Sequence, residues 1–265
     1  MAKTKDGTAY EITGRQGAAW VVLIHGLGLT YASTWGGIAP ILAQEFQILG
    51  YDLLGHGETD MPYGRVDLKR LGQQVIDLMD YLCIHRAALV GFSLGGMINR
   101  RVAIDRPSRV SALGILNAPH ERGEDQQRLV EERARASSLE GPSANIDTTL
   151  ARWFTPSFHI HYSQHVAAVR DIVVANDPES YAIHRQILAE GVGELIRPTP
   201  PLMQSSFIMT CQNDSGSTPA MSQAIAEEIT GSEVNILPKL QHLGILEEPK
   251  AFADPLLAFL RSKLS

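Results

Sequence analysis

Apolar and polar residues alternate in blocks through the first 118 residues of the chain. The run from Trp20 to Ile24 contains only apolar residues, which is typical of a buried central strand. Between such runs, apolar residues recur every three or four positions, as in 67–82, and predict helices that bury one side. Strands that alternate with helices indicate a mainly parallel sheet. We expect strands at 8–12, 20–24, 46–51, from 87, and at 112–117.

The pattern changes at about Pro119, and from there to about Thr199 no run resembles a buried strand. The periodicity of that segment predicts helices at 121–139, 148–158, 161–175 and 178–189. The alternation then resumes, with strands at 207–211 and 233–237 and helices at 219–230 and 249–264. We therefore expect an α/β core formed by residues 1–118 and 200–265, with a helical cap of residues 119–199 inserted over the C-terminal edge of the sheet.

Composition places the chain among ordinary globular proteins, with 44% hydrophobic and 20% charged residues in 265. The net charge of −6 disfavours nucleic acid or an anionic membrane as the main partner. The N-terminal residues lack the apolar core of a signal peptide, and no apolar run has the length of a membrane span. With only Cys83 and Cys211, the sequence predicts two free thiols in a cytoplasmic protein.

A Gly-x-Ser-x-Gly motif formed by Gly91, Ser93 and Gly95 follows the run that begins at Ala87. A helical pattern starts directly after it. Strand, sharp turn and helix are the context of a nucleophile elbow, which holds a serine hydroxyl at the edge of the sheet. Side chains at the two glycines would collide with neighbouring backbone in so tight a turn. The motif alone also fits a glycine-rich turn with an ordinary serine, so the rest of the chain must decide.

A serine becomes an effective nucleophile when a histidine takes its proton and a carboxylate orients that histidine. In a doubly wound sheet these groups come from loops at the C-terminal ends of strands. Asp214 follows one late strand and His242 follows the last, which gives the order Ser-Asp-His. We therefore expect Ser93, Asp214 and His242 to be catalytic. An acid after the preceding strand is the alternative, but Asn117 occupies that position.

Other histidines have simpler interpretations. His25 and His56 lie in tight glycine turns, where a structural hydrogen-bonding role is expected, as it is for the carboxylate of Asp52. His120 follows a strand but stands at the wrong place in the chain order. His161 and His165 are four residues apart on a predicted helix, yet no adjoining carboxylate or cysteine supports a metal site. We expect no metal and no cofactor.

The oxyanion formed during acyl transfer needs preorganised N–H donors. The residue after the nucleophile, Leu94, supplies one backbone N–H. The loop His25-Gly26-Leu27-Gly28 is expected to supply the other, from Leu27. The side chains of these two leucines matter little, because the backbone donates.

The chain resembles the α/β-hydrolase superfamily over essentially its whole length. The elbow, the turn at His25, the loop 52–58 and the terminal His242 match that superfamily in order. Within it, the chain is similar to 3-oxoadipate enol-lactonases. Tyr51-Asp52-Leu53-Leu54-Gly55-His56-Gly57 looks like that family's Tyr-Asp-x-Arg-Gly-His-Gly, and the segments 152–158, 177–181 and 242–249 echo further family motifs. Leu54 replaces the usual arginine, and His25-Gly26 replaces the more usual Asn-Ser.

The resemblance implies an enzyme without a cofactor that hydrolyses a small ester or enol-lactone, with a role in aromatic-compound catabolism. Cleavage of a C–C bond in a β-diketone or meta-cleavage-type substrate, or of an amide, would use the same triad. A ligand receptor that retains the fold but turns over slowly is the alternative of another class. An aspartate-nucleophile reaction is disfavoured because position 93 is serine.

Residues of the predicted cap are candidates for substrate contact. Trp153, Phe154 and Phe158 could wall an apolar pocket, or they could form the core of the cap itself. A guanidinium group binds a carboxylate in a bidentate manner, so an arginine of this region could recognise an acidic substrate. The candidates are Arg152, and also Arg185 and Arg197.

Overall fold

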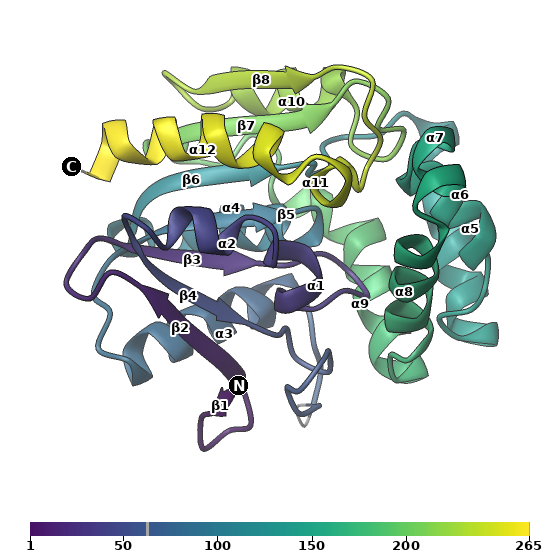
Figure 1. Ribbon diagram of the computed structural model, residues 1–265, viewed down its shortest axis with the longest axis horizontal. Helices are drawn as coiled ribbons and strands as arrows, with labels where there is room; N and C mark the ends of the chain where they lie inside the picture. The colour runs from purple at the N-terminus through teal and green to yellow at the C-terminus, as the bar shows by residue number, and fades with distance from the viewer. Residues whose placement is uncertain (62–63, 265) are drawn as a thin grey trace.

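A computed structural model describes residues 1–61 and 64–264, and its central element is a twisted sheet (Figure 1). Within these residues eight strands pair in the order β1-β2-β4-β3-β5-β6-β7-β8. β2 is antiparallel to β1 and β4, and the pairs from β4 to β8 are parallel. The strands are β1 (Ala2–Lys3), β2 (Ala9–Gly14), β3 (Trp20–Ile24), β4 (Gln47–Tyr51), β5 (Ala87–Phe92), β6 (Val110–Leu116), β7 (Ser205–Cys211) and β8 (Glu233–Leu237).

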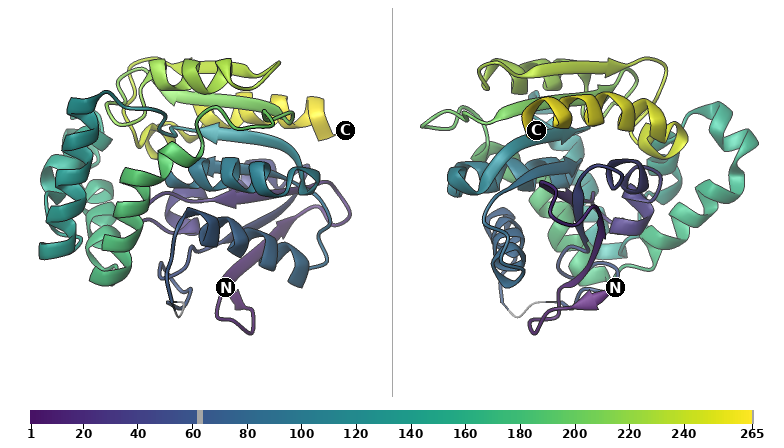
Figure 2. Two further views of the ribbon diagram at one scale, coloured as in Figure 1. Left: turned by 180° about the vertical axis from the view of Figure 1, so that it is seen from behind. Right: turned by 60° about the vertical axis from the view of Figure 1, so that its left-hand side comes forward.

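Helices cover both faces of the sheet (Figures 1 and 2). One face carries α1 (Tyr31–Trp35), α2 (Ala39–Leu42) and α12 (Pro249–Leu264), while α3 (Leu68–Tyr81), α4 (Leu94–Asp105) and α10 (Pro219–Glu227) cover the other. The short helices η1 (Pro107–Arg109) and α11 (Gly244–Glu247) lie in connections. This arrangement buries the central strands on both sides, as their continuous apolar sequence predicts.

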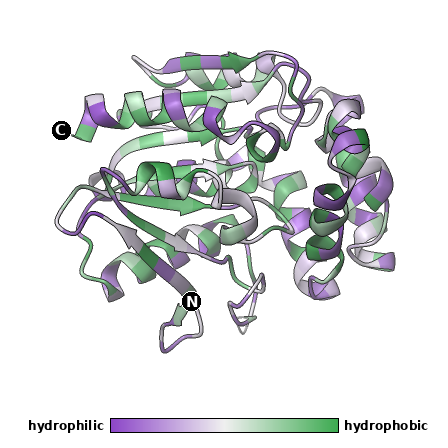
Figure 3. Cartoon of the chain, in the orientation of Figure 1, coloured by the Kyte–Doolittle hydropathy of each residue, from purple (hydrophilic) through white to green (hydrophobic). Residues whose placement is uncertain are grey.

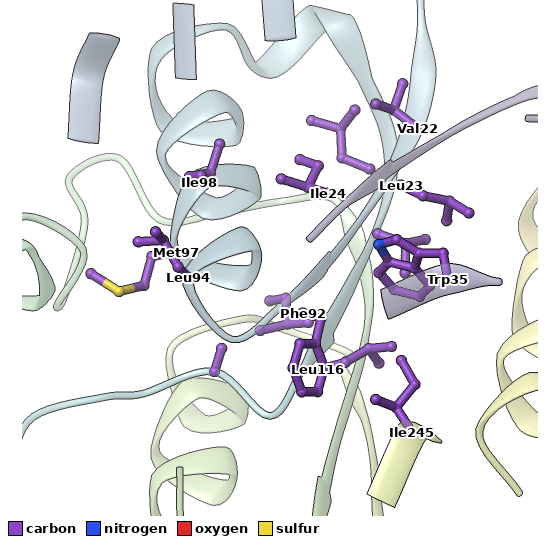
Figure 4. Close-up of a cluster of buried hydrophobic side chains, with 14 of the residues drawn as sticks. Val22, Leu23, Ile24, Trp35, Phe92, Leu94, Met97, Ile98, Leu116 and Ile245 are labelled. Carbon is purple, nitrogen blue, oxygen red and sulfur yellow. The ribbon is translucent and has the colours of Figure 1, made fainter. Parts of the chain in front are cut away.

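The hydrophobic core lies between the sheet and these helices, where apolar residues concentrate along the strands (Figure 3). Val22, Leu23 and Ile24 of β3 are fully buried. Figure 4 shows them beside Trp35 and Phe92, the latter at the end of β5. The end of β5 is therefore held by packing on several sides, which fixes the position of the residue that follows.

Five helices are inserted between β6 and β7, at the end of the sheet toward which the parallel strands point (Figure 1). We refer to them as the inserted helices. They are α5 (Glu124–Glu140), α6 (Ile146–Trp153), α7 (Pro156–His161), α8 (Ser163–Val174) and α9 (Pro178–Glu190), followed by the short η2 (Gly191–Glu194). Loops that leave the strands at this end therefore meet the inserted helices.

The α/β architecture predicted from the sequence, a mainly parallel sheet flanked by helices with a helical insertion, is confirmed. The prediction of one helix at 148–158 was wrong, because α6 ends at Trp153 and α7 begins at Pro156. Phe154 is extended, and the Thr155 hydroxyl caps α7 by accepting from the Phe158 N–H, with Pro156 at the first helical position. Strand β1 was not predicted, since two residues are too few to show a pattern.

Cys83 and Cys211 are both free thiols, the first exposed and the second buried. Within the described chain, no helix combines the length and the apolar character that crossing a membrane requires.

Candidate active site

Ser93 lies between the end of β5 and the start of α4. Its backbone has φ 55° and ψ −114°, a conformation that residues other than glycine rarely adopt. The turn is closed tightly by its two glycines. A Cβ on Gly91 would lie 2.0 Å from the carbonyl oxygen of Gly95, and a Cβ on Gly95 would lie 2.3 Å from that of Ile24. The packed sheet holds this strained turn in place, so that the hydroxyl stands at the N-terminus of α4.

Ser93, His242 and Asp214 are brought together from three separate loops. His242 Nε2 lies 3.2 Å from Ser93 Oγ, and His242 Nδ1 lies 2.6 Å from Asp214 Oδ2. Asp214 follows β7 and His242 follows β8, whose parallel pairing brings the two loops to the same edge of the sheet. The result is one continuous chain of polar contacts from a hydroxyl through an imidazole to a carboxylate.

Four hydrogen-bonding groups converge on the buried Asp214 carboxylate. The backbone N–H groups of Gly216 and Ser217 donate to Oδ1, at 2.9 and 3.0 Å. Asn117 Nδ2 donates to Oδ2 at 2.9 Å, the same oxygen that faces His242. Burial raises the pKa of Asp214, but the charge and hydrogen bond of His242 and the other donors outweigh it, so the pKa lies below its ordinary value. The carboxylate is therefore held ionised.

The contact between Asn117 and Asp214 was not predicted from the sequence. Asn117 stands in the position that an alternative acid would occupy, and the structure shows it bonded to the acid itself. Its backbone has φ 46°, and its N–H donates to the carbonyl of Met209 at 2.7 Å. The only signal in the sequence was its place at the end of a strand.

Leu27 and Leu94, the residues expected to supply the oxyanion donors, lie near the nucleophile, since Leu27 lines the same pocket as Ser93 and Leu94 follows Ser93 directly. Leu94 is the first residue of α4, so its N–H has no partner within the helix. No hydrogen bond from the Leu27 N–H to any described residue is found either. A Cβ on Gly26 would lie 3.3 Å from the Cβ of Ser93, which shows how closely this loop approaches the serine.

Polar contacts behind this loop hold it in shape. His25 Nε2 accepts from the Leu53 N–H at 2.9 Å, and His56 Nε2 accepts from the Gly28 N–H at 3.1 Å. The Asp52 carboxylate accepts from the backbone N–H groups of Tyr31 and Glu58. These are the structural roles that the sequence predicted for His25, His56 and Asp52.

Residues 21–254 match the model of the alpha/beta hydrolase family. The chain belongs to that family. It is 27% identical over 254 residues to 3-oxoadipate enol-lactonase 2 of Acinetobacter baylyi, an alignment that covers 95% of this chain and 92% of the relative. It is 23% identical to (E)-2-((N-methylformamido)methylene)succinate hydrolase of the same organism, over 91% of this chain and 90% of that one.

Among solved structures, the enol-lactonase from Burkholderia xenovorans LB400 aligns with a TM-score of 0.88 and 28% identity, covering 97% of this chain and 98% of the other. The predicted resemblance to enol-lactonase-like hydrolases is thus confirmed, and the chain is an enzyme of the alpha/beta hydrolase family.

The pocket of this hydrolase opens beside Ser93 and lies between the core loops and the inserted helices. Trp153 contributes to its wall, with its ring centroid 6.0 Å from that of His242. Phe154 and Phe158, which the sequence also proposed for substrate contact, do not line it. They stack on each other at 5.1 Å and are buried among the inserted helices, because the break between α6 and α7 turns them away.

Four arginines also line the pocket. Arg152 and Arg185, both candidates from the sequence, line it together with Arg122 and Arg133, which the sequence did not single out. Burial and neighbouring guanidinium groups lower the pKa of Arg122 and of Arg152 to about 10. The third candidate, Arg197, is exposed outside this pocket, 3.7 Å from Glu121.

The remaining histidines lie elsewhere. His120 Nε2 is 3.0 Å from Glu228 Oε1, and His120 does not line the pocket. His161 and His165 are exposed on the inserted helices. Across residues 1–61 and 64–264, no group of three or more metal-binding side chains gathers.

Proposed function

We propose that this hydrolase cleaves a small ester or enol-lactone by a Ser-His-Asp triad, through an acyl-enzyme formed on Ser93. The observation that carries the proposal is the unbroken contact from Ser93 Oγ through His242 to Asp214, at 3.2 and 2.6 Å, inside a pocket. Both distances suit proton transfer and orientation of the imidazole.

In the first half-reaction, His242 Nε2 takes the Ser93 proton as the oxygen attacks the carbonyl carbon. The tetrahedral oxyanion accepts hydrogen bonds from the N–H groups of Leu27 and Leu94. Collapse breaks the bond to the alcohol or enol oxygen, which receives the proton from His242 and leaves. In a lactone the leaving oxygen stays tethered to the acyl group. Asp214 remains ionised and stabilises the transient imidazolium.

In the second half-reaction, a water molecule replaces the leaving group. His242 takes one proton from the water as its oxygen attacks the acyl carbon. The bond to Ser93 Oγ then breaks, and the serine recovers its proton from His242. The free acid leaves, and the net reaction consumes one water for each bond that is cleaved.

In this proposal, the inserted helices determine the substrate specificity of the enzyme. They act as a cap over Ser93, formed by residues 119–199, that excludes water and selects the substrate. The name of the 27% identical relative, 3-oxoadipate enol-lactonase, supports an enol-lactone as the substrate. A role in aromatic-compound catabolism is what the resemblance to that family implies. The name of the second relative, which contains an N-methylformamido group, favours amide cleavage as the second candidate, and the same triad would perform it.

The test combines labelling with turnover. A serine-directed phosphonate is expected to label Ser93, located by peptide mass mapping, and Ser93→Ala should abolish both labelling and activity. A label confined to another serine, such as Ser215 or Ser217 of the pocket wall, would contradict the assignment. Many turnovers per site on a panel of small esters, lactones and amides support an enzyme, whereas a single burst followed by stable binding would indicate a receptor.

A further inference from the structure

Four arginine side chains converge on the pocket beside Ser93, although the protein as a whole carries a net charge of −6. All four come from the inserted segment. Arg122 precedes α5, and Arg133, Arg152 and Arg185 lie on α5, α6 and α9. We call them the arginine cluster. Asp214 is the one carboxylate among the described residues that line the pocket, and its oxygens already face His242, Asn117 and backbone donors.

The protein does not neutralise this cluster. Across the described parts of the chain, none of its four guanidinium groups forms an ion pair with an aspartate or glutamate. Arg100 makes the contrast, because this fully buried arginine has a carboxylate oxygen of Glu228 at 3.4 Å. Arg185 is buried and the other three are half-buried, and a guanidinium taken out of water without a charge partner is destabilising. Holding all four around one pocket therefore calls for a compensating group.

The hydrogen bonds of the cluster lead to the same conclusion. Arg122 donates to the carbonyl oxygens of Leu188 and Ala189, which satisfy donors but do not neutralise charge. Arg185 is only 8% exposed, lines the pocket, and has no partner for its Nε among the described residues. An anion in the pocket would supply both the missing acceptors and the missing charge.

From this geometry we propose that the arginine cluster binds a dicarboxylate portion of the substrate, so that the enzyme acts on an ester, lactone or amide carrying two carboxylates besides the bond that is cleaved. One carboxylate has two oxygens and one charge, which would leave most of the cluster unpaired. Two carboxylates match guanidinium groups that approach from separate helices. The proposal rests on the proposed function of Ser93.

The placement of the charges also orients the substrate. The triad belongs to the core loops, while the cluster belongs to the inserted segment. The reacting carbonyl would therefore lie against Ser93 while the carboxylates point toward α5 and α9. Placing the anions on that side also keeps them apart from the Asp214 charge.

Binding is tested first, without any catalytic step. Isothermal titration of the wild-type protein with succinate, succinamate and succinamide compares two, one and no charges on a single carbon skeleton. We expect affinity to rise at each step, with succinate about tenfold or more tighter than succinamate, as for charge-assisted hydrogen bonds. Equal affinities would overturn the proposal. Tighter binding of inorganic phosphate than of succinate would also overturn it, in favour of a phosphorylated ligand.

Variants then assign the binding to the cluster. Arg185→Gln and the half-buried Arg133→Gln should each weaken succinate binding about tenfold or more. Arg128→Gln is the matched control, since Arg128 lies on α5 but is exposed and pairs with Asp125. An equal effect of the control would reduce the result to general electrostatics and overturn the assignment. Using two variants keeps the test valid if Arg185→Gln does not fold.

Turnover separates this proposal from the proposed function. The acetate esters 2-acetoxysuccinate, 2-acetoxybutanoate and sec-butyl acetate again carry two, one and no charges. We expect kcat/KM to favour 2-acetoxysuccinate, and Arg133→Gln to reduce that preference about tenfold. Cleavage of all three esters without preference would overturn the dicarboxylate proposal and leave the serine hydrolase intact. Succinate binding without labelling of Ser93 would overturn the hydrolase and support an anion site.

Discussion

The distances at His242 indicate a separate role for each of its ring nitrogens in the proposed reaction. Its two ring nitrogens face different partners, with Nδ1 toward the ionised Asp214 and Nε2 toward Ser93. The carboxylate fixes which nitrogen carries the proton, leaving Nε2 free to accept one from the serine. His120 is also buried near the end of a strand, but its Nε2 faces Glu228.

This difference predicts unequal effects of removing the two histidines. His242→Ala should lower kcat by about 10³-fold or more, as expected when a triad base is lost. His120→Ala should lower kcat much less and act mainly on stability, because its contact joins the connection after β6 to the C-terminal end of α10. Steady-state kinetics with one small ester, together with melting temperatures, distinguish these results. A larger kinetic effect at His120 would refute the proposed base.

Asn117 allows a second test at the same scale. In Asn117→Asp, a second carboxylate would replace the amide that donates to Asp214 Oδ2. The second carboxylate adds negative charge beside the imidazolium of His242 and so favours its protonation. The acidic limb of the kcat/KM profile should therefore move to higher pH, by about one unit or more.

The control for this shift is Asn213→Asp. Asn213 adjoins Asp214 in sequence but is exposed, so solvent and salt screen the added charge. Its pH profile should match that of the wild type. If the Asn117→Asp profile were also unchanged, the contact between Asn117 and Asp214 would have no influence on the reaction.

How far sequence alone could predict this site depends on where its residues stand in the chain. Ser93, Asp214 and His242 each follow a strand, and the parallel sheet brings such positions to one edge. Arg133 lies on α5, and Arg122 lies just before that helix. Their approach to the pocket depends on how α5 packs against α9, which the periodicity of α5 does not specify. Sequence analysis therefore could not predict these two members of the arginine cluster, because their position depends on long-range packing.

At the scale of elements, local signals explain which boundaries were predictable. Apolar runs predicted β3 and β8 at their observed bounds, and Pro249 marked the start of α12. The break between α6 and α7 was missed although Thr155-Pro156 is a helix-start signal, since the apolar periodicity on either side reads as continuous. That break places Trp153 and Phe154 in different surroundings, one at the pocket and one in the packing of the inserted helices.

Substitutions of the neighbouring residues Trp153 and Phe154, at the end of α6, should therefore have different consequences. Trp153→Ala is expected to change the ratio of kcat/KM between a bulky and a small ester by about 1–3 kcal/mol, as for the loss of one pocket contact. Phe154→Ala should lower the melting temperature and change both esters alike, because Phe154 is fully buried and does not line the pocket. An unchanged ratio in Trp153→Ala would remove Trp153 from the specificity pocket.

At the scale of the whole molecule, the inserted helices and the core meet at a row of buried histidines. His184 of α9 packs edge-on against His56 at 4.5 Å, and His56 lies 5.4 Å from His25. Burial lowers the pKa of all three side chains, to about 4 for His184, while Asp52 partly opposes the effect at His25. The folded protein thus holds these rings neutral at a pH at which the unfolded chain protonates them.

This linkage predicts the direction in which stability changes with pH. The folded pKa of His184 is below the unfolded value of about 6.5, so the unfolded state binds more protons and stability falls as pH decreases. The contribution of His184 to the free energy of unfolding is complete above about pH 6.5 and is lost toward pH 4, amounting to at most about 3 kcal/mol.

Urea midpoints from pH 7.5 to 4.5 should decline less steeply in His184→Gln than in the wild type. His165→Gln, an exposed histidine on α8, should decline like the wild type. Equal slopes in all three proteins would mean that His184 is not held neutral where the inserted helices meet the core.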